Sequence, residues 1–303
     1  MSENVLNKID FEVLVSVKYA NPNGDPLSGN RPRTDYDDIG EISDVCIKRK
    51  IRNRMMDLGY PIFVQPSDRT TDGFLSLKDR MDSMCGKKDD DATIVKKMCN
   101  HWLDVRTFGQ VIALGSENGK GKGNGKGKNN GDQKEEESTT GKSIPVRGPV
   151  SIQFGISVSP VEVKSFQITK SVNNEANDGK RGSDTMGRKN LVKFGLYVIR
   201  GAINPSLAAR TGFSWSDAQV LKECLRTLFV NDSSSARPEG SMEVRRLYWW
   251  EHDCPSGQYS SAKVQRAVHI ALKDGVDTPT DFDDYEIELE NLDGLVPEVI
   301  DGE

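Results

Sequence analysis

The fold is decided by FEVLVSVKY, residues 11–19, and by the segments that follow it. Apolar and polar residues alternate along this stretch, and β-branched types are frequent in it, which predicts a β-strand. Residues 20–42 then contain NPNGD, SGNRPR and YDDIG, whose Gly, Pro, Asn and Asp content predicts a loop or a loose hairpin. A long turn-rich loop therefore projects from the end of the first strand.

The next segment, SDVCIKRKIRNRMMDLG, predicts a helix through about Leu58. Ser43 or Asp44 caps its start, and Gly59 ends it. Its apolar residues recur at spacings of four, four and three, so they form one buried stripe. The stripe consists of Ile47, Ile51, Met55 and Leu58.

Cations beside this stripe make the helix a candidate for binding phosphate. Lys48 and Arg52 lie one turn apart next to the stripe, and Arg49 lies further round. Lys50 and Arg54 flank the opposite edge. An ordinary amphipathic helix with a solvated cationic face explains the same pattern, and from the helix alone we favour that interpretation.

The rest of the chain alternates short helices and strands, which favours an antiparallel α+β fold over a doubly wound sheet. A polar stretch at 173–190 joins two predicted strands, so these strands form a protruding β-arm. Residues 116–142, with their alternating Lys and Gly, predict a flexible loop. The expected helices are 75–84, 92–104 and 215–230; the expected strands are 144–158, 163–172, 191–203 and 240–251, with a turn and a short strand within 104–115.

The charge is distributed unevenly along the chain. The net charge is −5, yet residues 274–303 contain twelve Asp or Glu and no Lys or Arg, which leaves +7 for residues 1–273. A basic body suits a protein that contacts phosphates on one face. We expect the acidic tail to be solvated, with a strand around 285–289 and a role in solubility.

No catalytic motif stands out. GxSxG, GxxxxGK[ST], HExxH and a dinucleotide fingerprint are all missing from the sequence. The three histidines, His101, His252 and His269, form no recognisable pair for acid–base chemistry. Asp25 and Asp35 in the first loop are of a type that can hold a metal ion, but turn formation explains them better.

Cysteine usage indicates a reducing compartment. The five cysteines form no CxxC pair, and their number is odd. Cys99 with His101, and His252 with Cys254, lack the usual spacing of zinc ligands, so we favour buried or incidental cysteines. No apolar run approaches the roughly 20 residues that a membrane span needs, and MSENVLNKID does not resemble a secretory signal. We therefore expect a cytoplasmic protein without a membrane partner.

Seven motifs in order carry a family resemblance, over about residues 11–255. They are VKYANPNGDPLSGNRPR, ISDVCIKRKIRN, DVRTFG, RGPVSIQFG, ITKSVNNE, TMGRK and VKFGLYVIRGAINP. Together they resemble the backbone subunit of CRISPR Cascade, a member of the RAMP superfamily, most closely in its type I-C form. The Lys/Gly-rich insertion is the main departure from that family.

The resemblance implies one domain, 1–303, with an RRM-like (ferredoxin-like) palm and insertions. Residues 60–115 would form a finger-like helical region, 116–142 the flexible loop, 163–200 a thumb hairpin, and 274–303 the acidic tail. It also implies a set of RNA-binding residues in the loop, the helix and the arm. These are Asn21, Asn23, Arg31, Arg33, Ser43, Lys48, Arg49, Arg52, Arg106, Lys170, Ser171, Asn173, Asn174, Met186, Arg188 and Lys189.

The function implied by the resemblance is to bind guide RNA (crRNA) along its backbone without catalysis, cofactor or metal. Copies of the chain would form a helical filament on the crRNA and present its bases in segments for pairing with target DNA. Further partners would be other Cascade subunits and a recruited helicase-nuclease in a prokaryotic cytoplasm. One alternative is a metal-dependent ribonuclease of the same superfamily that uses a loop aspartate, Asp25 or Asp35. The other is a DNA-binding or architectural protein outside CRISPR, in which the basic helix would read a groove of DNA.

Overall fold

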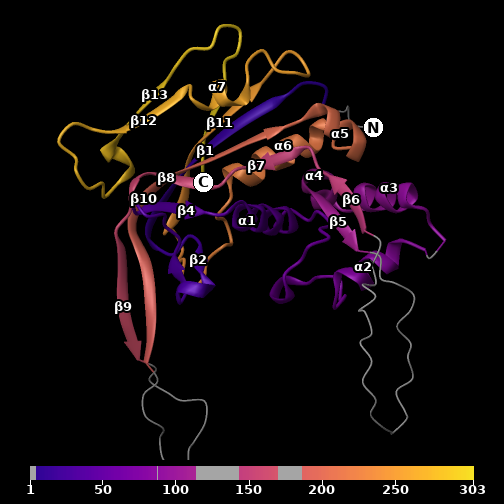
Figure 1. Cartoon of the computed structure of the whole chain (residues 1–303), viewed down its shortest axis with the longest axis horizontal. Helices are drawn as coiled ribbons and strands as arrows, with labels where there is room; N and C mark the ends of the chain where they lie inside the picture. The colour runs from indigo at the N-terminus through magenta and orange to yellow at the C-terminus, as the bar shows by residue number, and fades with distance from the viewer. Residues whose placement is uncertain (1–4, 87, 114–142, 170–185) are drawn as a thin grey trace, which may run out of the picture.

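A central antiparallel sheet organises the molecule (Figure 1). The computed structural model describes residues 5–86, 88–113, 143–169 and 186–303. Strand β1 (Ile9–Ala20) lies between β10 (Met186–Ile203) and β11 (Met242–Glu251), and it is paired with β10 along its full length. The strand order is β14-β11-β1-β10-β8-β4, with β14 at Glu298–Asp301, β8 at Gly155–Pro160 and β4 at Ile39–Ile42. Strands β7 (Val150–Ile152) and β9 (Val163–Thr169) also pair with β10.

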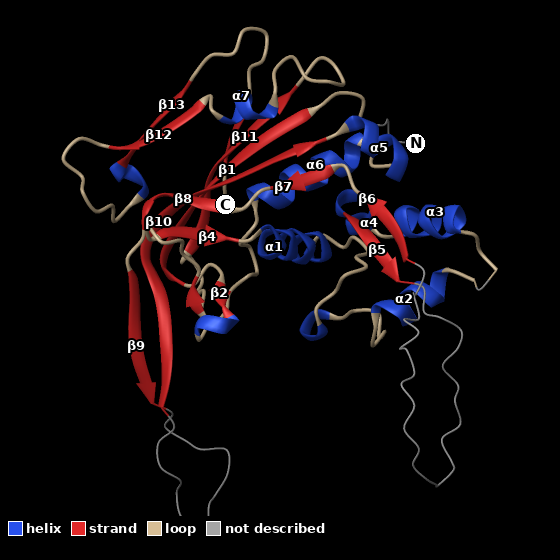
Figure 2. Cartoon of the chain, viewed as in Figure 1, coloured by secondary structure: helices blue, strands red, loops and turns tan. Residues whose placement is uncertain are grey.

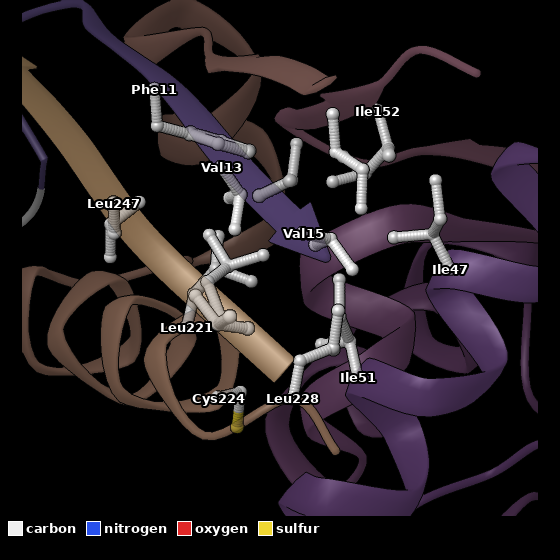
Figure 3. Packing of buried hydrophobic residues seen from close by; sticks show 14 of the residues in the cluster. Phe11, Val13, Val15, Ile47, Ile51, Ile152, Leu221, Cys224, Leu228 and Leu247 are labelled. Atoms are coloured by element: carbon white, nitrogen blue, oxygen red, sulfur yellow. The ribbon is translucent and has the colours of Figure 1, made fainter. Parts of the chain in front are cut away.

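One face of this sheet is covered by α1 (Asp44–Asp57) and α6 (Trp215–Arg226). Figure 3 shows Val13 and Val15 of β1 pointing toward Ile47 and Ile51 of α1 and toward Leu221 of α6. The predicted stripe is thus confirmed for its first three members. Leu58, its fourth, is 38% exposed because it lies at the helix end.

The other face is covered by α7 (Ser261–Gln265) and by the hairpin of β12 (Val268–Leu272) and β13 (Tyr285–Leu289). Both faces of β1 are therefore buried from Ile9 to Val17, although apolar and polar residues alternate along this strand. Asp10 and Glu12 are fully buried. Phe11 stacks on Trp249 at 5.6 Å and lies against Gly201, where a side chain would collide with the ring.

Four strands and two helices of this core follow one another as β1, α1, β8, β10, α6 and β11. In the sheet these strands lie in the order β11-β1-β10-β8, so the first strand is central and the last lies beside it. The mixed α+β class with an antiparallel sheet is as predicted. The connection from β10 to α6 includes α5 (Pro205–Thr211), which begins at a proline.

A second, smaller core lies beyond the end of α1, to the right in Figure 2. Its elements are α2 (Leu77–Met84), α3 (Asp91–His101), α4 (Leu103–Phe108), β5 (Gly109–Ala113) and β6 (Ser143–Arg147). Trp102 separates α3 from α4 and packs against Phe63 at 4.8 Å between ring centroids. The predicted helix over 92–104 is therefore two helices, and residues 104–108 are helical rather than a turn.

The predicted strand over 144–158 is likewise divided into β6, β7 and β8. Gly148 and Pro149 interrupt it. Proline lacks the N–H that a ladder needs, and Gly148 lies against the backbone of Phe108 and Gly109, where only glycine fits. This break places β6 beside β5 in the smaller core and β7 in the main sheet.

Strands β9 and β10 extend beyond the sheet as a two-stranded hairpin, at the lower left of Figure 2. Val163 pairs with Val192 at its base and Thr169 with Met186 at its far described end. The predicted arm is confirmed over these residues. Residues 170–185, with the predicted contacts Lys170, Ser171, Asn173 and Asn174, lie outside the described residues, as does the Lys/Gly-rich loop.

The acidic C-terminal segment is part of the fold, and it is more ordered than expected, although most of its carboxylate residues are exposed to solvent as predicted. Its predicted strand is confirmed as β13, and β14 adds a further strand beside β11. Ile300 packs against the main core, while Glu298 and Glu303 pair with Lys222 (2.7 Å) and Arg226 (3.0 Å) of α6. The apolar residues between the carboxylates provide the anchoring that net charge alone does not indicate.

The buried Glu12 should make stability depend on pH. Desolvation raises the pKa of Glu12 to about 7, although Arg200 at 2.7 Å favours the ionised form. In the unfolded chain this pKa is ordinary, so the stabilising protonation is fully present below pH 4.5 and is lost as pH rises to 7. Relative to Glu12→Gln, the wild-type free energy of unfolding should fall by up to about 3 kcal/mol between pH 4.5 and 8. Urea unfolding of both proteins at several pH values measures this; parallel pH profiles would contradict it.

Candidate nucleic-acid interface

The loop after β1 is anchored to the start of α1. The Asn23 Oδ1 atom accepts hydrogen bonds from both the backbone N–H and the hydroxyl of Ser43, each at 2.9 Å. Within the loop, β2 (Gly24–Asp25) pairs with β3 (Arg31–Pro32), and Asn21 donates from Nδ2 to the Asn30 carbonyl at 2.7 Å. The sequence-predicted residues Asn21, Asn23 and Ser43 are thus brought together.

The N-terminus of α1 has the usual polarity of a helix start. Ser43 has extended backbone dihedrals, and its hydroxyl accepts from the Cys46 N–H at 3.3 Å. The unpaired N–H groups of a first turn and the helix dipole favour an anion there. Lys48, one turn on, pairs with Asp44 at 2.9 Å and is part-exposed. This end of α1 therefore presents backbone N–H donors and Lys48 close to the loop after β1, which Asn23 and Ser43 hold in place.

Arg52 and Arg49 hold α1 to the smaller core. The Arg52 Nε donates to the fully buried Asp104 at 2.9 Å, and its guanidinium lies 5.1 Å from the centroid of the Phe108 ring. Arg49 donates to the Val64 carbonyl at 3.0 Å. Burial lowers the pKa of Arg49, and the neighbouring Arg52 lowers it further. Both side chains therefore have protein partners.

Arg106 has partners of its own as well. Its guanidinium forms two hydrogen bonds with Asp217 of α6, at 2.9 and 2.8 Å, and one with the Cys99 carbonyl at 3.2 Å. Asp217 at the same time closes the capping box of α6 with Ser214. The structure thus places Arg106 at the junction of α4 and α6.

The first loop holds two predicted arginines in different situations. Arg31 is exposed, and among the described residues it has no ion-pair partner. Arg33 donates to Asp25 at 3.3 Å. Asp25 also caps the short 3-10 helix Pro26–Ser28, and its pKa is lowered, chiefly by the hydrogen bond from Ser28.

The hairpin of β9 and β10 has two chemically different faces. Cross-strand partners share a face, so Gln167 lies with Arg188, and Ser165 with Asn190. Ser165 donates to Asn190 at 2.7 Å, and Asn190 donates to the Gly29 carbonyl at 3.5 Å, which connects this polar face with the first loop.

The opposite face of the hairpin is apolar and cationic. Phe166 and Ile168 are 44% and 49% exposed there, and Lys189 is the cross-strand partner of Phe166. Lys164, next along this face, lies over the ring of Tyr19 at 5.8 Å. Phe166 and Ile168 are not among the residues predicted from the sequence, which include Met186 at the start of β10 instead. The period of two in VKSFQIT is the signal that indicates them.

The carboxylates considered for metal binding take part in turns. Asp35 accepts from the N–H groups of Asp37 and Ile39, each at 2.9 Å. Among the described residues no group of three or more His, Cys, Asp or Glu is arranged to hold a metal ion. Cys99 is buried, and desolvation raises the pKa of its thiol to about 11, while His101 is exposed.

Comparison with known proteins agrees with the resemblance in the sequence. The model of the family described as CRISPR-associated protein Cas7 matches residues 7–290. The chain belongs to this family. A Cas7-family relative, the CRISPR-associated protein Cas7 of Haloferax volcanii, is 24% identical over 276 residues, which cover 88% of this chain and 76% of the relative.

This Cas7-family chain is also similar to solved chains of two assemblies. One belongs to a CRISPR RNA-guided surveillance complex, pre-nicking, with a TM-score of 0.41, 13% identity and coverage of 80% of this chain and 78% of that chain. The other belongs to a CRISPR RNA-guided surveillance complex, with a TM-score of 0.42, 17% identity and coverage of 80% and 69%. In the part of the chain that the structure describes, no helix has the length and apolarity to cross a membrane.

Asp104 should be essential to the junction between the Cas7 sheet domain and its smaller core. It accepts from Arg52 and from the N–H groups of Phe63 (2.7 Å) and Val64 (3.1 Å). Asp104→Ala leaves these donors buried without an acceptor and should lower the free energy of unfolding by about 3–5 kcal/mol. Urea unfolding measures this, with the exposed Asp82→Ala of α2 as the control; equal stabilities of the two variants would contradict it.

Proposed function

We propose that this chain is the non-catalytic backbone subunit of a type I-C CRISPR Cascade complex. Copies of it line the crRNA, bind its sugar–phosphate backbone without regard to sequence, and leave base edges free to pair with target DNA. The observation that carries the proposal is the pinned loop at the N-terminus of α1, where Asn23 and Ser43 are held together. Backbone donors at a helix start contact phosphate but read no base.

The predicted cations around this position fall into two groups, those that face solvent and those that already bind protein acceptors. Arg31 and Lys48 are exposed or part-exposed and are proposed to meet guide phosphates directly. Arg49, Arg52 and Arg106 reach protein acceptors, so any contact that they make with RNA is shared with these partners. Arg33 pairs with Asp25 as Lys48 pairs with Asp44, so each of these two cations is proposed to meet phosphate while it keeps an aspartate partner.

The remaining architecture supports a palm with two projections. The β-α-β-β-α-β order of the core supports an RRM-like palm. The smaller core of α2, α3 and α4 is proposed as the finger region and the β9–β10 hairpin as the thumb. Arg188 and Lys189 give both faces of this hairpin a cation, and Phe166 adds an exposed ring on which an unstacked base can lie.

The partners follow from this role. They are the crRNA, target DNA through base pairing, further copies of the chain in a filament, other Cascade subunits and a recruited helicase-nuclease, all in a prokaryotic cytoplasm. Because Asp25 and Asp35 accept hydrogen bonds from their own turns, no observation favours the ribonuclease alternative.

Direct phosphate contacts should show in the salt dependence of guide binding. Lys48→Met and Arg31→Met should each weaken binding of every guide sequence and reduce the slope of log K against log salt by about 0.7 per lost contact. Filter binding of two unrelated guides at several salt concentrations measures this. Lys97→Met is the matched control, since Lys97 is also a lysine on a helix, α3, that pairs with an aspartate, Asp89. An unchanged slope in both test variants would contradict the proposed phosphate site.

The hairpin should contribute by stacking. Phe166→Ala should weaken guide binding by about 1–3 kcal/mol and leave the salt slope unchanged, because an uncharged ring displaces no counterions. The control is Gln167→Ala, one residue along on the opposite face. Guide affinities and thermal melts of both variants decide it; equal affinities in the two would remove Phe166 from the RNA surface.

A further inference from the structure

Lys50 is the most buried cation of α1. Only 4% of its side chain is exposed, and its ammonium pairs with Asp232 and lies 5.3 Å from the centroid of the Phe229 ring. Burial lowers the pKa of Lys50, while Asp232 opposes this shift. The sequence pattern placed Lys50 at a flanking edge of the helix. A buried lysine is rare unless it is paired, so its position calls for an explanation.

Asp232 belongs to the segment between α6 and β11, which runs beside the end of β1. The Asp232 carboxylate also accepts from Arg237 Nε at 3.2 Å, so two cations hold it from different elements. Next to Arg237, the Ala236 carbonyl accepts from the Asn21 N–H at 2.9 Å, and the Ser241 carbonyl accepts from the Lys18 N–H at 2.8 Å. This segment thus bonds the chain on both sides of the point where the first loop begins.

These contacts connect α1 to the first loop, and the first loop in turn bonds to the start of α1. From Asn21 the chain passes Pro22, whose carbonyl accepts from the Cys46 thiol at 3.7 Å, and reaches Asn23, which holds Ser43. Lys50 lies two turns after Ser43 on the same helix. The start of α1 and the first loop are therefore positioned twice, through Asn23 directly and through Lys50 and Asp232.

We propose that Lys50 is a positioning residue for the guide-binding site. Through Asp232, Arg237 and the Ala236–Asn21 bond it sets the place of residues 21–23 relative to the N-terminus of α1, and it does not touch RNA. The inference rests on the proposed function. It assigns to one lysine of a basic helix a role different from that of Lys48, two residues earlier.

The first test needs no RNA. Hydrogen exchange of the Asn21 amide reports the bond to Ala236, and Lys50→Met should accelerate it at least tenfold in the folded protein while the amides of central β1 keep their protection. Lys48→Met should leave the Asn21 amide unchanged. Equal protection of Asn21 in wild type and Lys50→Met would overturn the inference. This result stands whether or not the chain binds a guide, so failure of the proposed function is distinguishable.

The second test separates positioning from contact. Lys50→Met should weaken guide binding about tenfold, by analogy with the loss of a residue that orients a metal ligand, and should leave the salt slope unchanged. A slope reduced as in Lys48→Met would show a direct phosphate contact and overturn the inference. Unchanged affinity with a lower melting temperature would show a purely structural role and overturn it as well.

A milder variant covers the case in which Lys50→Met does not fold. Arg237→Gln removes the second cation from Asp232 at a side chain that is 28% exposed. It should raise Asn21 exchange and weaken guide binding in the same direction as Lys50→Met, by a smaller factor. The matched control is Arg245→Gln. The Arg245 side chain is 29% exposed and pairs with Glu243, which takes no part in the contacts between Lys50 and Asn21. The inference fails if the two arginine variants behave alike.

Discussion

Pairing of β1 on both of its edges, with both of its faces covered, is the constraint on which the rest of this structure depends. Its backbone hydrogen-bonds to β10 and β11. Its side chains pack against the α1–α6 layer on one face and against the β12–β13 hairpin on the other. A strand held in this way cannot slip in register, because one residue of slippage would exchange its two faces. Whatever follows its last residue, Ala20, therefore starts from a defined point.

The candidate site is built on this point and on the start of α1. Neither part makes a binding site alone, since an isolated helix N-terminus offers hydrogen-bond donors but does not fix the direction from which a ligand reaches them. The Asn23–Ser43 contacts join the two, and the hairpin approaches the same loop through Asn190 and Gly29. Loop, helix and hairpin come from residues far apart in the chain, and the sheet brings them together.

Most cations near the site are paired with carboxylates of the protein and stabilise its fold. Arg52 is the cationic partner of the buried Asp104, Arg106 binds the Asp217 that caps α6, and Lys50 pairs with Asp232. A buried charge without a partner costs several kcal/mol, so these side chains have one dominant low-energy arrangement. The number of positive residues is thus a poor measure of an RNA-binding surface. Arg31 differs from its neighbours because it is exposed and has no ion-pair partner among the described residues.

From the sequence alone, local features were well determined: β1, α1 with its Ser43 cap and its stripe, the β9–β10 arm, and the family through its ordered motifs. These depend on alternation, helical spacing and capping, which act between residues close in the chain. Only the tertiary structure decided that Glu12 is buried, that residues 298–301 form a sheet edge, that α3 ends at Trp102, and which cations have partners. Burial and ion pairing depend on groups that lie far apart in the chain, 182 residues in Lys50 and Asp232 and 263 in Lys18 and Asp281, and no local pattern encodes such a distance.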